Sequence, residues 1–237
     1  MQTNNIDRDL LRALEPGEIK KRELEQHVQP YNALVGKLAQ SQKKHSPAEF
    51  VRLFTLQWRL GPIAYDGNAL AGRVALLVLN PNFADDATPE SHYRPDPECP
   101  LAALSSRATL GTQKYYRETV FKHLLQHYEA KDLAAKFLKI ELSPWASRKF
   151  PTMGKLVRAL EAFPSRSLTV KFVEQLVSSG AVIAVMKGVG HWPRNVPMLV
   201  PLIGLQAFKN SAPIGNYLTP KTMGELGWRA ILNALEE

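Results

Sequence analysis

The sequence predicts an α/β protein with three layers, α/β/α, built on a mostly parallel central sheet of about four strands. Two continuous apolar runs, residues 74–79 and 181–186, are rich in branched residues and bounded by Gly, Asn or Pro. Runs without alternation are typical of strands that are buried on both faces of a parallel sheet. Helical patterns separate the strand candidates along the chain, and this order indicates an α/β domain.

Weaker patterns predict the remaining elements of the sheet and its covering helices. The further strand candidates are residues 137–142 and 202–208, and the helical patterns are residues 114–128, 153–163, 168–179 and 222–235. We expect the last helix to begin with a capping box formed by Thr222 and Glu225.

Residues 1–60 are expected to form an N-terminal helical extension of the same domain, which spans residues 1–237. Leucines recur at helical spacing near residue 10, and Pro30 predicts a break in the long charged stretch that follows. A further helix is expected to begin at Ser46, with Pro47 in its first turn and Glu49 completing a capping box. Its predicted apolar face consists of Phe50, Phe54, Leu56 and Trp58.

Length and composition exclude several classes of protein. The chain has 237 residues, enough to bury a core of its own. The single cysteine, Cys99, excludes an intrachain disulfide, a four-cysteine zinc site and a cysteine-ligated iron–sulfur cluster. The longest apolar runs have six residues, far fewer than the roughly 20 that span a bilayer. With a polar N-terminus that does not resemble a secretory signal, we expect a cytoplasmic protein without a membrane partner. The sequence does not determine the oligomeric state, although a monomer is favoured.

The charge balance favours a polyanionic partner. There are 30 Lys and Arg against 22 Asp and Glu, a formal net charge of +8. From residue 143 to residue 237, eleven basic side chains stand against five acidic ones, whereas residues 81–100 hold five acids and one Arg. A basic half of this kind fits nucleic acid, although a solvated basic surface explains the count equally well.

Ligands of α/β sheets bind beyond the carboxyl ends of the strands, so the loops that follow the predicted strands are the candidate site. The loop after the first strand begins Asn80-Pro81-Asn82-Phe83, and the loop after the second contains Ser143-Pro144-Trp145. The loop after the last contains Asn210-Ser211-Ala212-Pro213-Ile214-Gly215. In combination these three segments resemble the uracil-DNA glycosylase superfamily, over about residues 72–220.

The resemblance implies a uracil-DNA glycosylase-like fold and a metal-free, cofactor-free hydrolysis of an N-glycosidic bond. Asn80 would orient the water that attacks C1′, with Asp85 as the alternative, and Asn210 would stand beside the departing base. An aromatic face would stack on the flipped base, and small polar groups would hold its edge. The implied base-binding residues are Pro81, Asn82, Phe83, Ser143 and Trp145.

The same resemblance implies a surface that holds DNA through its phosphates and fills the gap left by base flipping. Implied phosphate contacts are Ser147, Arg148, Lys149, Lys187, Arg194, Lys209 and Ser211. Ile214, Tyr217 and Leu218 stand where relatives carry an apolar wedge.

The sequence departs from the superfamily at three positions. Both outer glycines of the first motif are replaced, by Val78 and Asn82, and the histidine of the last motif is replaced by Asn210. Because an amide cannot carry the charge of an imidazolium, these departures suggest a non-standard base. One expectation is a modified pyrimidine such as the hypermodified cytosine of phage DNA, which would make the protein an antiphage defence enzyme.

Two alternatives from other classes stay open. The first is a non-catalytic nucleic-acid-binding module on the same scaffold. The second is a metal-dependent nuclease that uses Asp85, Asp86 and Glu141, although Glu-x-Lys sequences occur only in helical stretches. His123 and His127 are four residues apart on a predicted helix, a spacing that more often marks a helix surface than a metal site.

Overall fold

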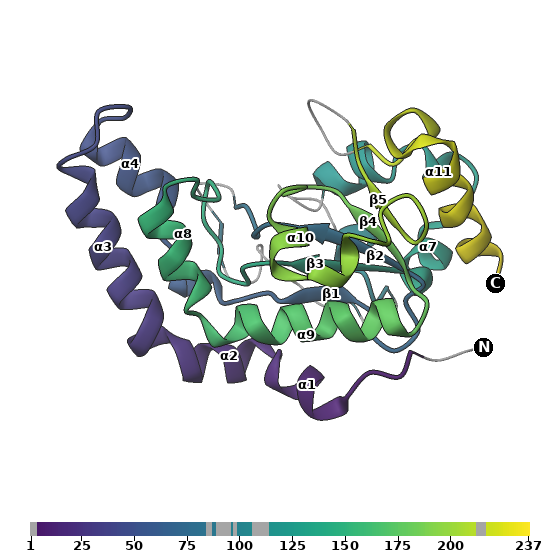
Figure 1. Ribbon diagram of the computed structural model, residues 1–237, viewed down its shortest axis with the longest axis horizontal. Helices are drawn as coiled ribbons and strands as arrows, with labels where there is room; N and C mark the ends of the chain where they lie inside the picture. Colours follow the sequence, from purple (N-terminus) through teal and green to yellow (C-terminus); the bar gives the residue numbers. More distant parts are fainter. Residues whose placement is uncertain (1–3, 84–86, 89–95, 97–98, 106–113, 212–216) are drawn as a thin grey trace.

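Five strands form one mixed sheet in the order β1-β3-β2-β4-β5 (Figure 1). In this computed structural model the described residues are 4–83, 87–88, 96, 99–105, 114–211 and 217–237. Strands β2 to β5 run parallel, and β1 pairs antiparallel with β3. The bounds are β1 (Tyr65–Gly67), β2 (Val74–Val78), β3 (Phe137–Glu141), β4 (Val182–Val185) and β5 (Ala207–Lys209).

The α/β class is therefore confirmed, and the expectation of a mostly parallel sheet of about four strands is corrected to a five-stranded mixed sheet. The missing strand is β1, whose three residues form neither an apolar run nor an alternating pattern. The two six-residue runs do form strands, and every residue of β2 is buried.

Helices cover both faces of the sheet because successive side chains of each strand point to opposite sides. Leu77, Ile140 and Val185 belong to a core on one face, and Leu76, Phe137 and Met186 belong to a second core on the other. The first core is covered by α1 (Arg8–Ala13), α2 (Pro16–Glu23), α3 (Gln29–Ala39), α4 (Pro47–Phe54), α8 (Gly154–Glu161), α9 (Pro164–Ser178) and α10 (Trp192–Asn195). The second is covered by α7 (Ala130–Lys136) and α11 (Pro220–Glu236).

The N-terminal extension packs on the helices of the first face (Figure 1). Helix α1 contacts α9, and α3 contacts both α4 and α8. The Ser46 side chain caps α4 as expected, accepting a hydrogen bond of 3.2 Å from the Glu49 amide. The Glu49 carboxylate does not complete a capping box and lies 3.2 Å from His45 Nδ1 instead. The break expected at Pro30 occurs just before it, as a π-helical turn at Leu24–Val28, and Pro30 lies in the first turn of α3. Trp58 is 44% exposed and does not join the apolar face of α4.

Two helix predictions were wrong in detail. Residues 114–128 do not form one long helix, but contain a π-helical turn at Tyr116–Val120 and a 3-10 turn at Leu124–Gln126. The capping box of α11 is formed by Thr219 and Thr222, not by Thr222 and Glu225. The proline that follows Thr219 explains the shift, because its fixed backbone angle suits the first turn of a helix and so places the start of α11 there.

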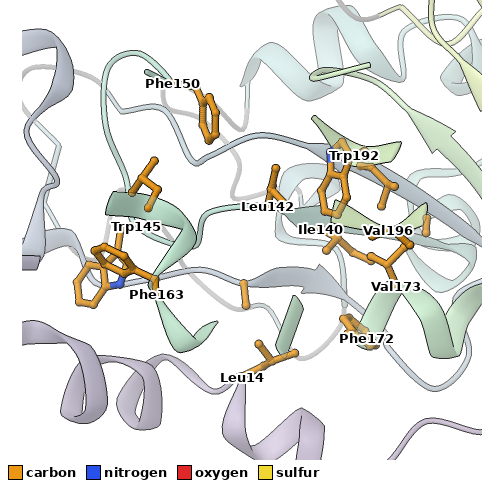
Figure 2. Packing of buried hydrophobic residues seen from close by; sticks show 14 of the residues in the cluster. Leu14, Ile140, Leu142, Trp145, Phe150, Phe163, Phe172, Val173, Trp192 and Val196 are labelled. Atoms are coloured by element: carbon orange, nitrogen blue, oxygen red, sulfur yellow. The ribbon is translucent and has the colours of Figure 1, made fainter. Parts of the chain in front are cut away.

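A buried carboxylate, Glu23, links the extension to the rest of the domain. Its residue is 0% exposed, and its carboxylate accepts hydrogen bonds from the Trp145 indole at 2.8 Å and the Ser165 hydroxyl at 2.9 Å. The Ser165 amide donates to the same group. Figure 2 shows Trp145 among the buried side chains of the first core. Three segments far apart in the sequence therefore meet at one carboxylate.

In the part of the chain that the structure describes, no helix has both the length and the apolar character needed to cross a membrane.

We predict that Trp145→Phe lowers the free energy of unfolding by about 1–3 kcal/mol, because it removes a donor to a buried carboxylate. Urea unfolding followed by circular dichroism measures the change. Trp58→Phe is the matched control, since that indole is 44% exposed. Equal effects of the two substitutions would contradict the role given to the Glu23 contact.

Candidate functional site

The carboxyl ends of the parallel strands lie at one edge of the sheet, where the loops after β2 and β3 are joined by backbone hydrogen bonds. The Ser143 amide donates to the Leu79 carbonyl at 2.8 Å, and the Ser147 amide donates to the Pro81 carbonyl at 3.2 Å. These bonds continue the pairing of β2 with β3 beyond the strands. The two loops therefore form one connected piece of structure at the edge predicted to bind a ligand.

The side chain of Asn80 is held by this pairing. Its Nδ2 donates to the Ser147 carbonyl at 2.8 Å, to Ser147 Oγ at 3.0 Å and to the Pro81 carbonyl at 3.2 Å. A carbonyl oxygen can only accept, so these contacts determine which end of the amide is nitrogen. No hydrogen bond to Asn80 Oδ1 is present among the described residues, and this oxygen can orient a water molecule.

Ser147 is a buried residue that positions Asn80. It is 2% exposed, and its hydroxyl donates to the Lys149 carbonyl at 3.1 Å while accepting from Asn80. The hydroxyl is therefore fully engaged within the protein. This corrects the expectation that Ser147 binds DNA.

A cation lies over the ring of Phe83. The guanidinium carbon of Arg148 is 4.6 Å from the centroid of the Phe83 ring, a cation–π contact between the loops after β2 and β3. The Phe83 amide donates to Asn82 Oδ1 at 2.8 Å. Phe83 and Arg148 are half-buried, while Asn82 and Lys149 are exposed. Pro81 is buried.

Trp145 does not reach this surface. It is 0% exposed and bonded to Glu23, so its ring cannot stack on a base, and the expectation of a base contact is corrected. A tryptophan in a loop that also holds Ser143 and Ser147 suggests exposure, but packing in the first core and the distant partner Glu23 explain its burial. Ser143, at 4% exposed, is also largely enclosed.

Asn210 closes the loop after β5 instead of facing Asn80. Its backbone amide donates to the Val185 carbonyl at 3.0 Å, and its Nδ2 donates to the Tyr217 carbonyl at 2.7 Å. Strand β4 lies between β2 and β5, which separates their ends by about 10 Å. Within the described residues, the two asparagine side chains are therefore bonded to different segments.

The remaining predicted contacts divide between exposed and buried positions. Ser211 Oγ donates to the Thr222 carbonyl at 3.0 Å, and Leu218 is 0% exposed, so it packs in the core and is not a wedge. Tyr217 is 43% exposed.

Asp85, Asp86 and Ile214 lie outside the described residues. Three expected phosphate contacts at this edge are exposed: Lys187, Arg194 and Lys209.

Sequence reasoning missed a buried group of charges on the second face. Lys139 Nζ lies 3.3 Å from Glu141 Oε1 and 5.2 Å from the centroid of the Tyr116 ring. Asp66 on β1 is in register with Lys139 and accepts hydrogen bonds from the Ala102 amide. The available signal was a Lys and a Glu two residues apart in an otherwise apolar strand.

Burial raises the pKa of both carboxyl groups in this charged group. For Asp66 and for Glu141, the loss of hydration outweighs the opposing effect of the Lys139 ammonium. Burial also raises the pKa of Tyr116 well above its usual value, with the charge of Glu141 acting in the same direction.

The histidines do not form a metal site with other ligands in the described part of the chain. The rings of His123 and His127 lie 5.6 Å apart, beside Trp228. His191 packs against Phe150 at 5.0 Å, and burial lowers its pKa, with the nearby arginines acting in the same direction.

Comparison of the chain with protein-family models, with curated proteins and with solved structures gave no match.

We predict that Glu141→Gln removes part of the pH dependence of stability. Burial raises the native pKa of Glu141 above the unfolded value of about 4.3, so the native state binds the proton more tightly. Stability is therefore lost as the pH rises through and above that value. As the pH rises above about 4.3, the free energy of unfolding of the wild type should fall relative to that of the variant.

Urea unfolding at a series of pH values measures this difference. Glu225→Gln, at a side chain that is 85% exposed, controls for the loss of one carboxylate. Parallel curves for the wild type and Glu141→Gln would contradict the prediction.

Proposed function

We propose that this protein is a DNA glycosylase that resembles the uracil-DNA glycosylase superfamily and hydrolyses the N-glycosidic bond of a flipped-out, modified pyrimidine. The observation that carries the proposal is the Asn80 amide, whose nitrogen is held by Ser147 while its oxygen is left for a water molecule. It stands directly after β2, at the edge of the sheet where α/β proteins bind ligands.

Breaking an N-glycosidic bond builds positive charge on the sugar and negative charge on the leaving base. A water held by an amide oxygen can then attack C1′ without a strong base, because the sugar is already electron-poor. In this mechanism Asn80 orients the water and Ser147 holds Asn80 in position. Asp85 is the alternative base, as a carboxylate accepts the proton more readily. The product is an abasic site and a free base.

The surroundings of Asn80 suit a flipped nucleotide. The Phe83 ring supports stacking, and the Arg148 guanidinium over it adds a charge that attracts phosphate. Further exposed cations follow or end the parallel strands: Lys149 and Lys187 on loops, Arg194 on α10 and Lys209 at the end of β5. Tyr217, with 43% of its surface exposed, is retained as the candidate wedge.

Asn210 has a positioning role in this proposal. Its side-chain nitrogen donates to the Tyr217 carbonyl, which anchors the loop that carries the candidate wedge. The leaving base is then stabilised by cations at the edge and not by a side chain at position 210. Together with Val78 and Asn82 in place of glycines, this difference favours a modified pyrimidine as substrate. Hypermodified cytosine in phage DNA, and a role in defence, are the specific form of the proposal.

One assay separates this function from its alternatives. Duplexes that carry candidate bases are incubated with the protein, with and without EDTA, and one half of each sample is then treated with alkali. Strand breaks that require alkali support a glycosylase. Breaks without alkali that disappear in EDTA support the nuclease that uses Asp85 and Asp86, and binding without breaks supports the non-catalytic module.

We predict that Asn80→Ala lowers the single-turnover rate of excision by about 10²-fold or more, because the attacking water loses its partner. The affinity for the same duplex, measured by fluorescence anisotropy, should change less than about threefold, since Asn80 makes no phosphate contact in this mechanism. Ser147→Ala should give a smaller loss of rate, because the backbone carbonyl of that residue still accepts from the amide.

Asn233→Ala on α11 is the control, as this asparagine is exposed and far from the edge. Full activity of Asn80→Ala would refute the role given to the amide.

We predict that Arg148→Ala weakens binding to DNA of any sequence and reduces the slope of log affinity against log salt by about 1. Titrations between low and moderate salt measure both quantities. Lys171→Ala is the matched control, because this exposed lysine lies on α9 and not on the loops at the carboxyl edge. An unchanged slope for Arg148→Ala would exclude a phosphate contact at this position.

A further inference from the structure

The positive charge of the protein is concentrated in two segments that pack together. Residues 26–60 hold five Lys or Arg and one acid, and residues 142–163 hold four and one. The other residues hold 21 Lys or Arg and 20 acids, so they are nearly neutral. The first segment contains α3 and α4, the second contains α8, and α3 contacts both of the other helices. We call these two segments the basic arm, whose helices lie at one end of the molecule (Figure 1).

Three exposed cations of the basic arm lie on α4 and on the turn before it: Lys43, Lys44 and Arg52. Within the described part of the chain, none of them takes part in an ion pair. Glu49, the one acid of residues 26–60, lies 3.2 Å from His45 Nδ1. Like charges that no acid offsets repel one another in the free protein, and a bound polyanion relieves this repulsion.

The turn that carries two of these cations is held by hydrogen bonds. The Lys44 and His45 amides each donate to Gln42 Oε1 at 2.9 Å, and Gln42 Nε2 donates to the His45 carbonyl. The Ser46 hydroxyl then caps α4. The backbone that carries Lys43 and Lys44 is therefore ordered before a partner binds, which lowers the entropy cost of binding.

Helix α4 connects this turn to the candidate site. The Lys149 amide donates to the Leu53 carbonyl at 3.0 Å, so the loop after β3 lies against the residue that follows Arg52. Lys149 directly follows Arg148, the cation over the Phe83 ring. Cations thus extend from the candidate site along α4 to the turn before it. The eight residues of α4 span about 12 Å, which is the length of about three to four base pairs of duplex.

The surface of α4 favours a nucleic acid over a membrane as its partner. A helix that lies on a membrane inserts an apolar face beside its basic residues. On α4 the aromatic side chains, Phe50 and Phe54, are 1% and 6% exposed because they pack in the first core. Val51 is 38% exposed, which is a small apolar surface for an anchor. The exposed face of α4 thus offers charge without an apolar anchor, and this suits a phosphate backbone.

We propose that the basic arm binds the phosphate backbone of duplex DNA beside the flipped nucleotide, through Lys43, Lys44 and Arg52 in line with Lys149. This inference rests on the proposed function for the choice of DNA, and it gives the N-terminal extension a role in binding. Contacts to phosphate add affinity and position the duplex, and they read no base. Each phosphate that a cation neutralises adds about 0.9 to the magnitude of the slope of log affinity against log salt.

The test removes the charges of the turn and of α4 in separate variants. Lys43→Gln combined with Lys44→Gln removes two charges and keeps polar side chains at both positions. Fluorescence anisotropy with an unmodified duplex, from low to moderate salt, measures the affinity and the slope. We expect this double variant to bind more weakly and to lower the magnitude of the slope by about 2. Arg52→Gln, which leaves the turn unchanged, should lower it by about 1.

Two matched variants separate the charge of the arm from the net charge of the protein and from folding. Lys131→Gln combined with Lys171→Gln removes two exposed cations on α7 and α9, outside the arm, and should leave the slope unchanged. Lys43→Arg combined with Lys44→Arg keeps the charge of the turn and should keep the slope. Because every substituted side chain is exposed, the melting temperatures should match that of the wild type.

The outcomes distinguish this inference from the proposed function. An unchanged slope in the Lys43 and Lys44 double variant overturns the inference, and base excision by the wild type would leave the glycosylase in place. A lower slope without excision of any base supports the arm as a DNA-binding surface and overturns the glycosylase. An equal loss of slope in the Lys131 and Lys171 variant overturns the inference, because the effect then follows from net charge alone.

Two other probes test the choice of partner. The wild type is titrated with duplex RNA of the same sequence and with vesicles that contain phosphatidylserine. We expect the DNA duplex to bind more tightly than either. Tighter binding of the RNA duplex, or binding of the vesicles without binding of DNA, overturns the assignment of the arm to DNA.

Discussion

The carboxylate of Glu23 is the interaction on which the arrangement of the site depends. It is fully buried on α2, and its donors come from Trp145 in the loop after β3 and from Ser165 at the start of α9. A buried carboxylate is tolerated only when hydrogen bonds replace its hydration. Moving either donor away would leave the carboxylate short of a hydrogen bond and destabilise the fold, so both donors stay in place. This contact makes the N-terminal extension a structural part of the domain rather than an appendage.

The effect of that contact reaches the edge of the sheet through one loop. Trp145 lies two residues before Ser147, whose carbonyl and hydroxyl both accept from the Asn80 amide. The extension also holds this loop from its other side, since the Gln57 amide donates to the Ala146 carbonyl at 2.8 Å. Asn80 is therefore oriented by residues whose own positions depend on helices far away in the sequence. A side chain with no such support would sample several rotamers and hold a water poorly.

The sequence was informative where one local pattern decided the structure. The continuous apolar run of β2 predicts a strand buried on both faces, because it is short, rich in branched residues and bounded by Gly and Asn-Pro. The sequence did not predict the position of Trp145, because its burial depends on Glu23, which lies 122 residues away in the sequence. The short strand β1 was missed for a related reason. Asp66 is acceptable inside the sheet only because Lys139 and the Ala102 amide lie beside it.

Contacts between distant segments also determine the geometry of the candidate site, and the sequence motifs did not predict them. Sequence motifs suggested two asparagines acting together, yet Asn80 bonds toward β3 whereas Asn210 bonds toward Tyr217. The β2–β3 side of the edge holds the oriented amide and the Phe83–Arg148 pair. The proposed contacts to a flipped nucleotide therefore come from the loops after these two adjacent strands. In the proposed mechanism, the segment after β5 contacts the DNA around the base and not the bond that breaks.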